Sequence, residues 1–458
     1  MRNKFTILGI ILVLSSIIVL AQANFSTSLH STREGKATAY NRENGGMEIL
    51  TNIPIGNLPC QNCHADKYPD GENVDDATYT PSCRDCHNQA EQFSVSEQTC
   101  LNCHSRKVAE VQMYPDHVNP HNEHGMKCWS CHNKSDLHGD DGVRYAGMHD
   151  ENAIKAKCTN CHTSLPQNSA HTMHANSGNF ECQACHIKSI VQCQNCHLES
   201  VIQAHIKRAQ TRIKDFQLLV KRHGKYTSGS FMTHVYNGQT NVIFAPLTGH
   251  LIDPAGKKCS DCHYNMGAKN AAIADYNERQ KIALLKWDPD QKKFNNMKGI
   301  IPLVPDWYNA YEIDFVNYDG DPTKPTDPSQ WSFIKQGFDN GHLFYCEPLT
   351  VDEMQKLGFT RFPTDVETFE SQTIAFKGIF PNPVNDFGRV TFTLKIGSKV
   401  NISVYDINGN LVATVADHFM NANEYSLGFN SANLPSGKYI VKLTTYDFVA
   451  VKEMIVLH

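Results

Sequence analysis

Residues 182–197 read Cys-Gln-Ala-Cys-His, then Ile-Lys-Ser-Ile-Val-Gln, then Cys-Gln-Asn-Cys-His. The pattern Cys-x-x-Cys-His therefore occurs twice, with the first cysteines eleven residues apart. Such a pentapeptide is the attachment sequence of c-type haem: each thiol forms a thioether with the macrocycle, and the adjacent histidine ligates the iron. A tether of eleven residues also holds two such cofactors close together, within about 40 Å even if the chain were fully extended.

The cysteine count strengthens this interpretation. Eight copies of the pattern use sixteen of the seventeen cysteines and leave only Cys346. Zinc sites do not require a histidine directly after the second cysteine, and a disulfide framework requires none. We therefore predict eight covalently attached haem c groups. The predicted attachment residues are Cys60, Cys63, Cys83, Cys86, Cys100, Cys103, Cys128, Cys131, Cys158, Cys161, Cys182, Cys185, Cys193, Cys196, Cys259 and Cys262. The predicted proximal iron ligands are His64, His87, His104, His132, His162, His186, His197 and His263.

The remaining histidines are candidates for the opposite side of each iron. Of 23 histidines, eight belong to the motifs and fifteen do not, and eleven of those fifteen lie between His117 and His250. An iron with two imidazoles is coordinatively closed and suited to moving single electrons. Histidines three or four residues apart can serve two haems from one helical face, and His205 lies on an apolar stripe of a predicted helix that continues to Ile213. Methionines are the rival ligands. The preferred distal histidines are His117, His121, His124, His138, His171, His174, His205 and His250.

The chain divides into five segments. Residues 1–23 have a basic start, an apolar middle and an Ala-Gln-Ala end, which predicts a signal peptide, with a retained membrane anchor as the alternative. Residues 24–58 are expected to be a flexible arm or an edge strand. For residues 59–266 we expect a mostly irregular and helical multihaem domain whose core is the haem stack, because so thin a chain cannot build a conventional core. Residues 267–373 are expected to form a haem-free cap, or alternatively a substrate-binding module, in which Cys346 is a buried, inert thiol.

Residues 374–458 differ in character. Short alternating apolar runs separated by turn sequences predict a small β-sandwich. Phe380-Pro381-Asn382-Pro383, Val404-Tyr405-Asp406-Ile407-Asn408-Gly409 and Leu434-Pro435-Ser436-Gly437-Lys438-Tyr439 occur in this order. On these motifs the segment resembles the carboxy-terminal sorting domain of the type IX (Por) secretion system. The resemblance implies recognition by that machinery and release or surface attachment, via the periplasm. The alternative is an adhesive or carbohydrate-binding sandwich.

The eight motifs and their surplus histidines resemble the exported multihaem cytochromes c of the octahaem class. Enzymes similar to these act on nitrite, tetrathionate or hydroxylamine. Nitrite reductases of this kind replace one motif histidine with lysine, and no motif in this chain does so. Tyr264 follows His263 directly, and we interpret it as a packing residue rather than as the cross-linked tyrosine of hydroxylamine oxidoreductases.

These observations predict an extracellular or cell-surface cytochrome that relays electrons through eight mainly bis-histidine haems, and more readily an electron carrier than an enzyme. The expected partners are other cytochromes or outer-membrane electron-transfer components, with filaments of the chain itself as a further alternative. The competing hypothesis is a multihaem oxidoreductase that acts on a small nitrogen or sulfur compound at one open iron. A formal net charge of −5 without a long basic run gives no support for nucleic-acid binding.

Overall fold

The computed structural model of the chain describes residues 25–58, 64–175, 177–204, 208–267, 269–324, 327–363, 374–394, 398–420, 423–445 and 449–458. The predicted signal peptide, residues 1–23, lies outside these ranges. No helix in the described part of the chain is long and apolar enough to cross a membrane. The chain forms two compact units, of which the first comprises residues 1–39 and 54–167 and the second residues 40–53 and 168–458.

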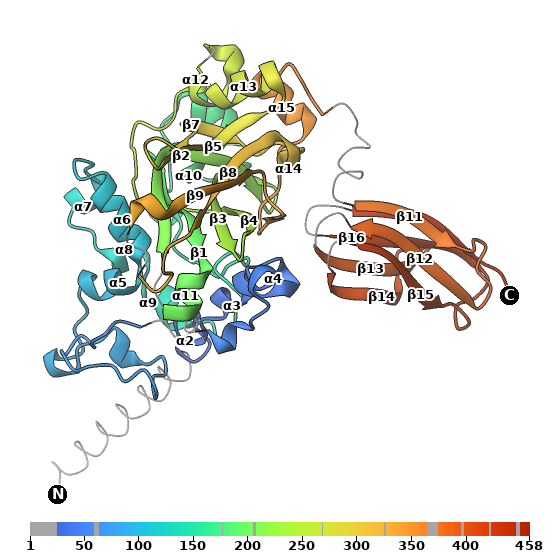
Figure 1. The fold of residues 1–458 in the computed structure, drawn as a ribbon, viewed down its shortest axis with the longest axis horizontal. Helices are drawn as coiled ribbons and strands as arrows, with labels where there is room; N and C mark the ends of the chain where they lie inside the picture. The colour runs from blue at the N-terminus through green and yellow to red at the C-terminus, as the bar shows by residue number, and fades with distance from the viewer. Residues whose placement is uncertain are drawn as a thin grey trace, which may run out of the picture. The chain divides into compact units, whose positions relative to one another are not determined.

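The first unit consists of short helices and turns (Figure 1). Even its longest described helix has only nine residues, and helix starts depend on local caps, such as the Ser96 hydroxyl that accepts a hydrogen bond from the Thr99 N–H. Few of its described apolar side chains are buried. The irregular, helical character predicted for this part is confirmed. Its elements are α2 (Leu29–Thr32), α3 (Glu34–Tyr40), η2 (Ile55–Asn57), η3 (Cys83–Asp85), η4 (Gln89–Glu91), α5 (Glu97–Cys103), α6 (Ser105–Met113), α7 (Pro120–Glu123), α8 (Cys128–Cys131), α9 (Lys134–His138) and η5 (Cys158–Asn160).

The predicted amino-terminal arm is folded rather than extended. Within residues 25–58, the helix α2 begins after Ser28, whose side chain accepts a hydrogen bond from Ser31 N–H. Residues 40–53 belong to the second unit and contain η1 (Arg42–Asn44) and α4 (Glu48–Thr51). The Tyr40 hydroxyl, in a side chain only 3% exposed, lies 2.6 Å from the Thr51 hydroxyl. This stretch is therefore held by buried contacts.

The second unit is built around a six-stranded sheet with the order β10-β4-β3-β1-β2-β7. A four-stranded sheet with the order β6-β5-β8-β9 accompanies it. The strands of the first sheet are β1 (Ile190–His197), β2 (Arg208–Arg222), β3 (Lys225–Tyr236), β4 (Gln239–Pro246), β7 (Gly299–Pro302) and β10 (Asn340–Leu343). The strands of the second are β5 (Ile282–Asp288), β6 (Lys293–Asn296), β8 (Tyr311–Tyr318) and β9 (Trp331–Gln336). The helical elements are η6 (His171–Ala175), α10 (Gln183–His186), α11 (Leu198–Ala204), α12 (Cys259–Cys262), η7 (Tyr264–Met266), α13 (Ala271–Arg279), α14 (Trp307–Ala310), η8 (Pro328–Gln330) and α15 (Val351–Leu357).

A conventional hydrophobic core joins residues on both sides of the expected boundary at residue 266. It includes Phe216, Phe231, Phe244 and Trp307, each no more than 1% exposed. Strand β7 pairs with β2, and β10 pairs with β4, so residues after 266 complete the same sheet as residues before it. The expectation of a mainly irregular and helical domain up to residue 266 is therefore wrong for its last part, which is β-rich. Cys346 is buried, as expected, and its thiol donates to the Phe244 carbonyl at 3.4 Å.

The predicted helix through His205 is also wrong. Helix α11 ends at Ala204 and strand β2 begins at Arg208. Ile213, expected on the helical stripe, lies opposite Gln192 in the antiparallel ladder of β1 and β2. Ala209, Thr211 and Ile213 alternate with Gln210, Arg212 and Lys214, and this two-residue period is that of a strand rather than of a helix. His205 itself lies outside the described residues.

The carboxy-terminal segment forms the predicted β-sandwich. One sheet has the order β11-β12-β15 and the other β14-β13-β16-β17. Side chains from both sheets share one core, which includes Phe392, Ile402 and Val441. The strands are β11 (Ile374–Phe380), β12 (Phe387–Leu394), β13 (Ser398–Asp406), β14 (Leu411–Met420), β15 (Asn423–Asn430), β16 (Gly437–Thr444) and β17 (Val449–Val456).

Candidate haem sites

Six of the Cys-x-x-Cys-His motifs adopt the same local conformation. In each, the backbone N–H of the histidine donates to the carbonyl of the first cysteine, four residues earlier. This hydrogen bond closes one helical turn, which brings both thiols and the imidazole together at one place on the chain. The N···O distances are 2.9 Å for His87 to Cys83, 2.9 Å for His104 to Cys100, 3.0 Å for His132 to Cys128, 2.9 Å for His162 to Cys158, 2.9 Å for His186 to Cys182 and 2.8 Å for His263 to Cys259.

The imidazoles of several motifs are oriented through Nδ1. Because a carbonyl or carboxylate oxygen only accepts, Nδ1 is the donor and Nε2 keeps the lone pair that a metal needs. The oxygen acceptors are Phe93 O for His87 at 2.7 Å, Asp253 O for His186 at 3.0 Å, Lys356 O for His263 at 2.9 Å and Asp136 Oδ2 for His132 at 2.9 Å. These four side chains therefore present Nε2 as a metal ligand.

The first motif is only partly described. Cys60 and Cys63 lie outside the described residues, whereas His64 lies within them. The Nδ1 atom of His64 donates to its neighbour's carbonyl, Ala65 O, at 2.9 Å. Its Nε2 atom lies 3.2 Å from the carboxylate of Asp76. The Asp76 side chain is 89% exposed to solvent.

Five motif histidines face a second histidine at a constant separation. With metal–nitrogen bonds of about 2 Å and about 1.1 Å from each nitrogen to its ring centre, two imidazoles on opposite sides of one metal have centroids about 6.2 Å apart. The observed centroid separations are 6.2 Å for His30 and His104, 6.1 Å for His87 and His138, 6.1 Å for His121 and His162, 6.1 Å for His171 and His186, and 6.2 Å for His174 and His263. These residues fit the two axial ligands of a haem iron.

One turn of chain supplies two of these second histidines. His171 and His174 lie in the same five-residue helical turn, η6. His171 faces His186, and His174 faces His263. Helical residues three apart have Cβ atoms about 5–6 Å from each other. This turn therefore keeps the motifs at Cys182 and Cys259 close to each other.

Burial favours the neutral form of four of the paired imidazoles. Desolvation lowers the pKa of His30 to about 4, with a further contribution from His104. Burial also lowers the pKa of His104, His138 and His174. Only a neutral imidazole has a lone pair to offer a metal, so this electrostatic environment favours the ligand form of each side chain.

The segment Cys193–His197 behaves differently from the six turns. It lies in strand β1, between β2 on one side and β3 on the other. His197 is 2% exposed, and its Nε2 atom accepts a hydrogen bond from the Tyr318 N–H at 3.0 Å. Its Nδ1 atom lies 3.2 Å from the Glu199 carboxylate. The predicted attachment turn is therefore absent from Cys193, Cys196 and His197.

The predicted distal histidines have different outcomes. His121, His138, His171 and His174 lie opposite motif histidines, whereas His117, His124 and His250 are not among these five pairs. Sequence reasoning missed His30, which lies in the polar stretch assigned to a flexible arm. The only available signal was the surplus of histidines over motifs, because His30 and its partner are far apart in the sequence.

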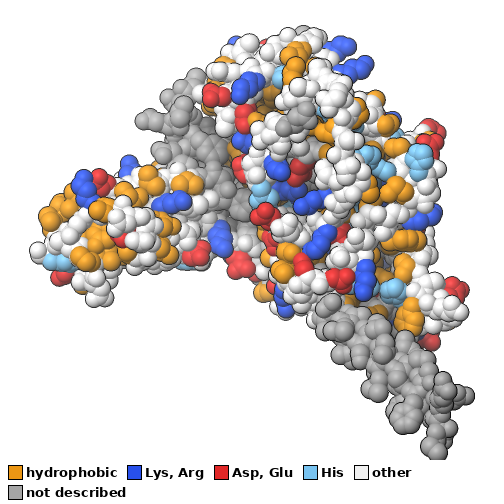
Figure 2. All heavy atoms as spheres, turned by 180° about the vertical axis from the view of Figure 1, so that it is seen from behind, with side chains coloured by type: hydrophobic (Ala, Val, Ile, Leu, Met, Phe, Trp, Pro, Cys, Tyr) orange, Lys and Arg blue, Asp and Glu red, His pale blue; other side chains and the backbone are white. Residues whose placement is uncertain are grey.

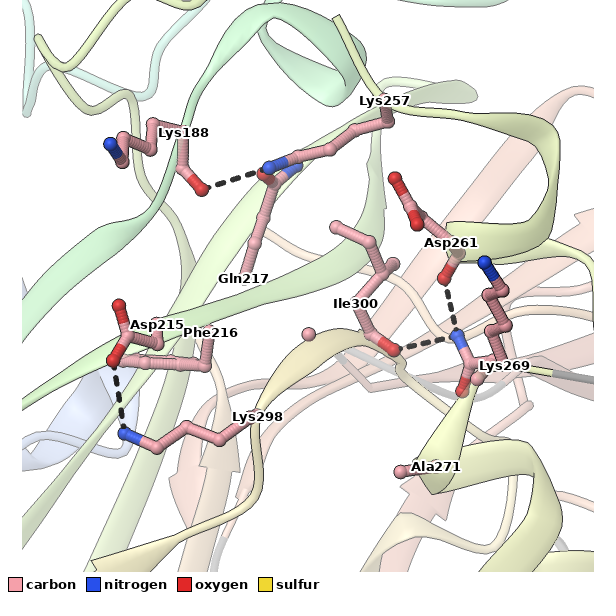
Figure 3. A pocket seen from close by; sticks show the side chains of 12 residues that line it. Lys188, Asp215, Phe216, Gln217, Lys257, Asp261, Lys269, Ala271, Lys298 and Ile300 are labelled. Carbon is pink, nitrogen blue, oxygen red and sulfur yellow. Dashed lines mark hydrogen bonds and ion pairs between the residues drawn. The ribbon is translucent and has the colours of Figure 1, made fainter.

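A basic pocket lies beside the motif at Cys259 (Figure 3). Lys257 Nζ donates to the Lys188 carbonyl at 2.8 Å, and burial lowers the pKa of Lys257. Lys298 lies 3.4 Å from Asp215. Lys269 also lines the pocket. Four lysines and two aspartates, Asp215 and Asp261, give its lining a positive balance. Elsewhere, acidic and basic side chains are interspersed on the face shown in Figure 2.

Comparison with known proteins identifies two segments. A family model described as cytochrome c7 and related cytochrome c matches residues 47–105, which contain the motifs that begin at Cys60, Cys83 and Cys100. A model described as a secretion system C-terminal sorting domain matches residues 378–457. No curated protein matches the chain. The chain thus contains a cytochrome c7-like multihaem region, which implies c-type haem and electron transfer, and a type IX sorting domain, which indicates secretion to the cell surface or beyond.

Proposed function

We propose that this chain, a multihaem c-type cytochrome exported through a carboxy-terminal sorting domain, relays electrons outside the cell between outer-membrane components and an external partner. The sorting domain implies processing by the type IX secretion machinery. Bound haem supplies the one-electron exchange between ferric and ferrous iron. The protein's own residues attach each macrocycle, ligate its iron and set the spacing between sites.

The five imidazole pairs are the observation that carries the proposal. Each pair has a centroid separation of 6.1–6.2 Å, so the two imidazoles would hold an iron between them and would leave no place on it for a substrate. A closed iron changes its charge without binding or releasing a reactant, which is the behaviour of a carrier rather than of a catalyst. The competing oxidoreductase hypothesis requires an open iron, and these five sites do not provide one.

The arrangement along the chain supports relay over short steps. Motifs that begin at Cys60, Cys83, Cys100, Cys128 and Cys158 belong to the first unit. In the second unit, the shared turn η6 keeps the sites at Cys182 and Cys259 adjacent. Four lysines line the pocket beside the Cys259 motif, and we propose that they hold anionic groups such as haem propionates. Propionates neutralised by these lysines would stabilise the oxidised iron less, and so would favour the reduced state of the haem at Cys259.

Spectroscopy of the secreted protein tests the proposal. We expect low-spin spectra in the ferric state and little binding of carbon monoxide by the ferrous protein. We also expect rapid reoxidation by soluble extracellular electron acceptors. A stoichiometric high-spin iron that binds and turns over nitrite or hydroxylamine would instead support the oxidoreductase hypothesis. Absence of covalent haem from the secreted protein would overturn both.

The sorting domain offers a second test. Deleting residues 374–458 removes the sandwich and its own separate core. We expect the truncated chain to retain covalent haem and to accumulate in the periplasm. A chain that still reached the medium after this deletion would contradict the export route.

A further inference from the structure

We infer that the segment Cys193-Gln-Asn-Cys-His197 carries no haem, so that the chain holds seven haem groups on eight copies of the attachment sequence. The inference rests on the proposed haem sites at the other motifs, and it concerns one segment in which the sequence pattern and the fold disagree. It also assigns that segment another role, as a central strand of the β-rich part of the second unit.

The side chains of Cys196 and His197 point in different directions. In a strand, successive side chains point to opposite faces of the sheet. Cys196 lies beside His234 in the parallel ladder with β3, whereas the next residue, His197, directs its imidazole to Tyr318 of strand β8. A haem attached through Cys196 would therefore lie on the face of the sheet opposite to the imidazole that should ligate its iron. In the six turns the thiols and the imidazole are instead brought together.

The backbone of the segment is paired with a strand on each side. An attachment turn needs the N–H of the histidine to donate to the carbonyl of the first cysteine, as it does in the six turns. In this segment Cys193 pairs with Arg212, and His197 pairs with Arg208, in the antiparallel ladder with β2. On the other side, Cys196 and His197 pair with β3. Rewinding the segment into a turn would break a central strand of the six-stranded sheet.

The two residues between the cysteines are buried. Gln194 and Asn195 are 0% exposed. Gln194 Nε2 donates to the Phe231 carbonyl at 2.9 Å, and its Oε1 atom accepts from the Thr233 hydroxyl at 2.8 Å. Exposing these amides to make room for a macrocycle would leave their partners unsatisfied in the core.

Asn195 extends this network to the second sheet. Its side chain donates to the Val316 carbonyl at 2.8 Å and accepts from the Val316 N–H at 3.1 Å. Its backbone N–H donates to the Thr233 hydroxyl at 2.7 Å. The Tyr318 N–H also donates to His197 Nε2. Side chains of this one segment therefore bind backbone groups of both Val316 and Tyr318 in β8. Of the two variable residues of this motif, Asn195 thus contacts β8, whereas Gln194 contacts β3.

Peptide mapping of the wild-type holoprotein tests the inference without a variant. Trypsin cleaves after Lys188 and Lys207, which isolates residues 189–207 with Cys193 and Cys196. We expect this peptide to carry no haem and to take up two alkyl groups after reduction. The preceding peptide, residues 158–188, contains two complete motifs and is the internal control, expected to carry two haems. A haem on peptide 189–207 would overturn the inference and leave the proposed relay function intact.

Paired variants give an independent readout. The double variant C193S/C196S is expected to keep the full haem content of the wild type, measured by intact mass, whereas C182S/C185S is expected to lose one haem. Loss of one haem from C193S/C196S would contradict the inference. If peptide 158–188 and peptide 189–207 both lacked haem, the proposed function would fail as well, so the two failures are distinguishable.

Discussion

Replacing His30 with alanine removes one predicted iron ligand and leaves the rest of the protein unchanged. His30 lies in the short helix α2 and faces His104 with a centroid separation of 6.2 Å. The motif turn of Cys100–His104 lies elsewhere in the first unit, so the substitution leaves its thiols and its proximal imidazole unchanged. We expect haem attachment to remain complete, and the iron at this site alone to lose its sixth ligand.

The expected magnitude follows from the pairing. Each imidazole pair would hold one iron, so His30→Ala should convert one haem per chain, about one in seven of the total, from low spin to high spin. Carbon monoxide titration of the ferrous variant should show one additional equivalent bound per chain relative to wild type. Ferric spectra should gain a high-spin signal of the same stoichiometry.

A matched control separates this effect from general disturbance. His223→Asn changes an exposed histidine in the hairpin turn between β2 and β3, where φ is 50° and asparagine is tolerated. We expect the spectra of this variant to match wild type. The reasoning would be refuted if His30→Ala bound no extra carbon monoxide, or if His223→Asn produced the same new signal.

Three further predictions follow from the geometry. Asp136→Asn removes the carboxylate that accepts a hydrogen bond from His132 Nδ1. Because the ferric state should lose about 1 kcal/mol of charge-assisted stabilisation, the reduction potential of that haem should rise by about 40 mV in a spectroelectrochemical titration. A fall in this potential would contradict the prediction. Asn195→Ala strands both polar groups of Val316 and should lower the free energy of unfolding by about 3–5 kcal/mol in urea titrations, whereas a change below about 1 kcal/mol would argue against the proposed role of this strand. Burial lowers the pKa of His234 from 6.5 to about 4, so between these pH values the unfolded chain binds a proton that the folded chain does not, and stability falls as pH falls. The free energy of unfolding should decrease by about 3 kcal/mol between pH 7 and pH 4, and His234→Gln should not show this decrease.

Local chemistry explains which parts of the haem sites could be predicted. The turn at Cys83 or Cys259 needs only five consecutive residues, so its sequence is sufficient to indicate it. The second ligand depends on tertiary structure, which is why His121 and His138 were predicted from their density whereas His30, far from any other histidine cluster, was missed. Long-range pairing cannot be read from spacing alone.

The same reasoning explains the errors in the β-rich part. The residues of Cys193–His197 satisfy the attachment pattern, but Val316 and Tyr318, about 120 residues later, supply the partners that hold them in a strand. The alternating β-branched and aromatic residues of β3 were available as a signal, yet the nearby cysteine motifs led us to extend the haem-dominated region over them. The cysteine motif indicates only what five residues can do locally, whereas the two-residue period of the neighbouring strands indicates the sheet that contains them.

The turn His171–Ala175 has a consequence for how the protein matures. Its two imidazoles face the histidines of two motifs whose first cysteines, Cys182 and Cys259, are 77 positions apart. An iron held by His171 and His186 would already fix the conformation of the whole turn, and so would leave His174 in place opposite His263. Ligation of the second iron by His174 and His263 should then be easier than ligation of the first, so ligation at the two sites should be cooperative.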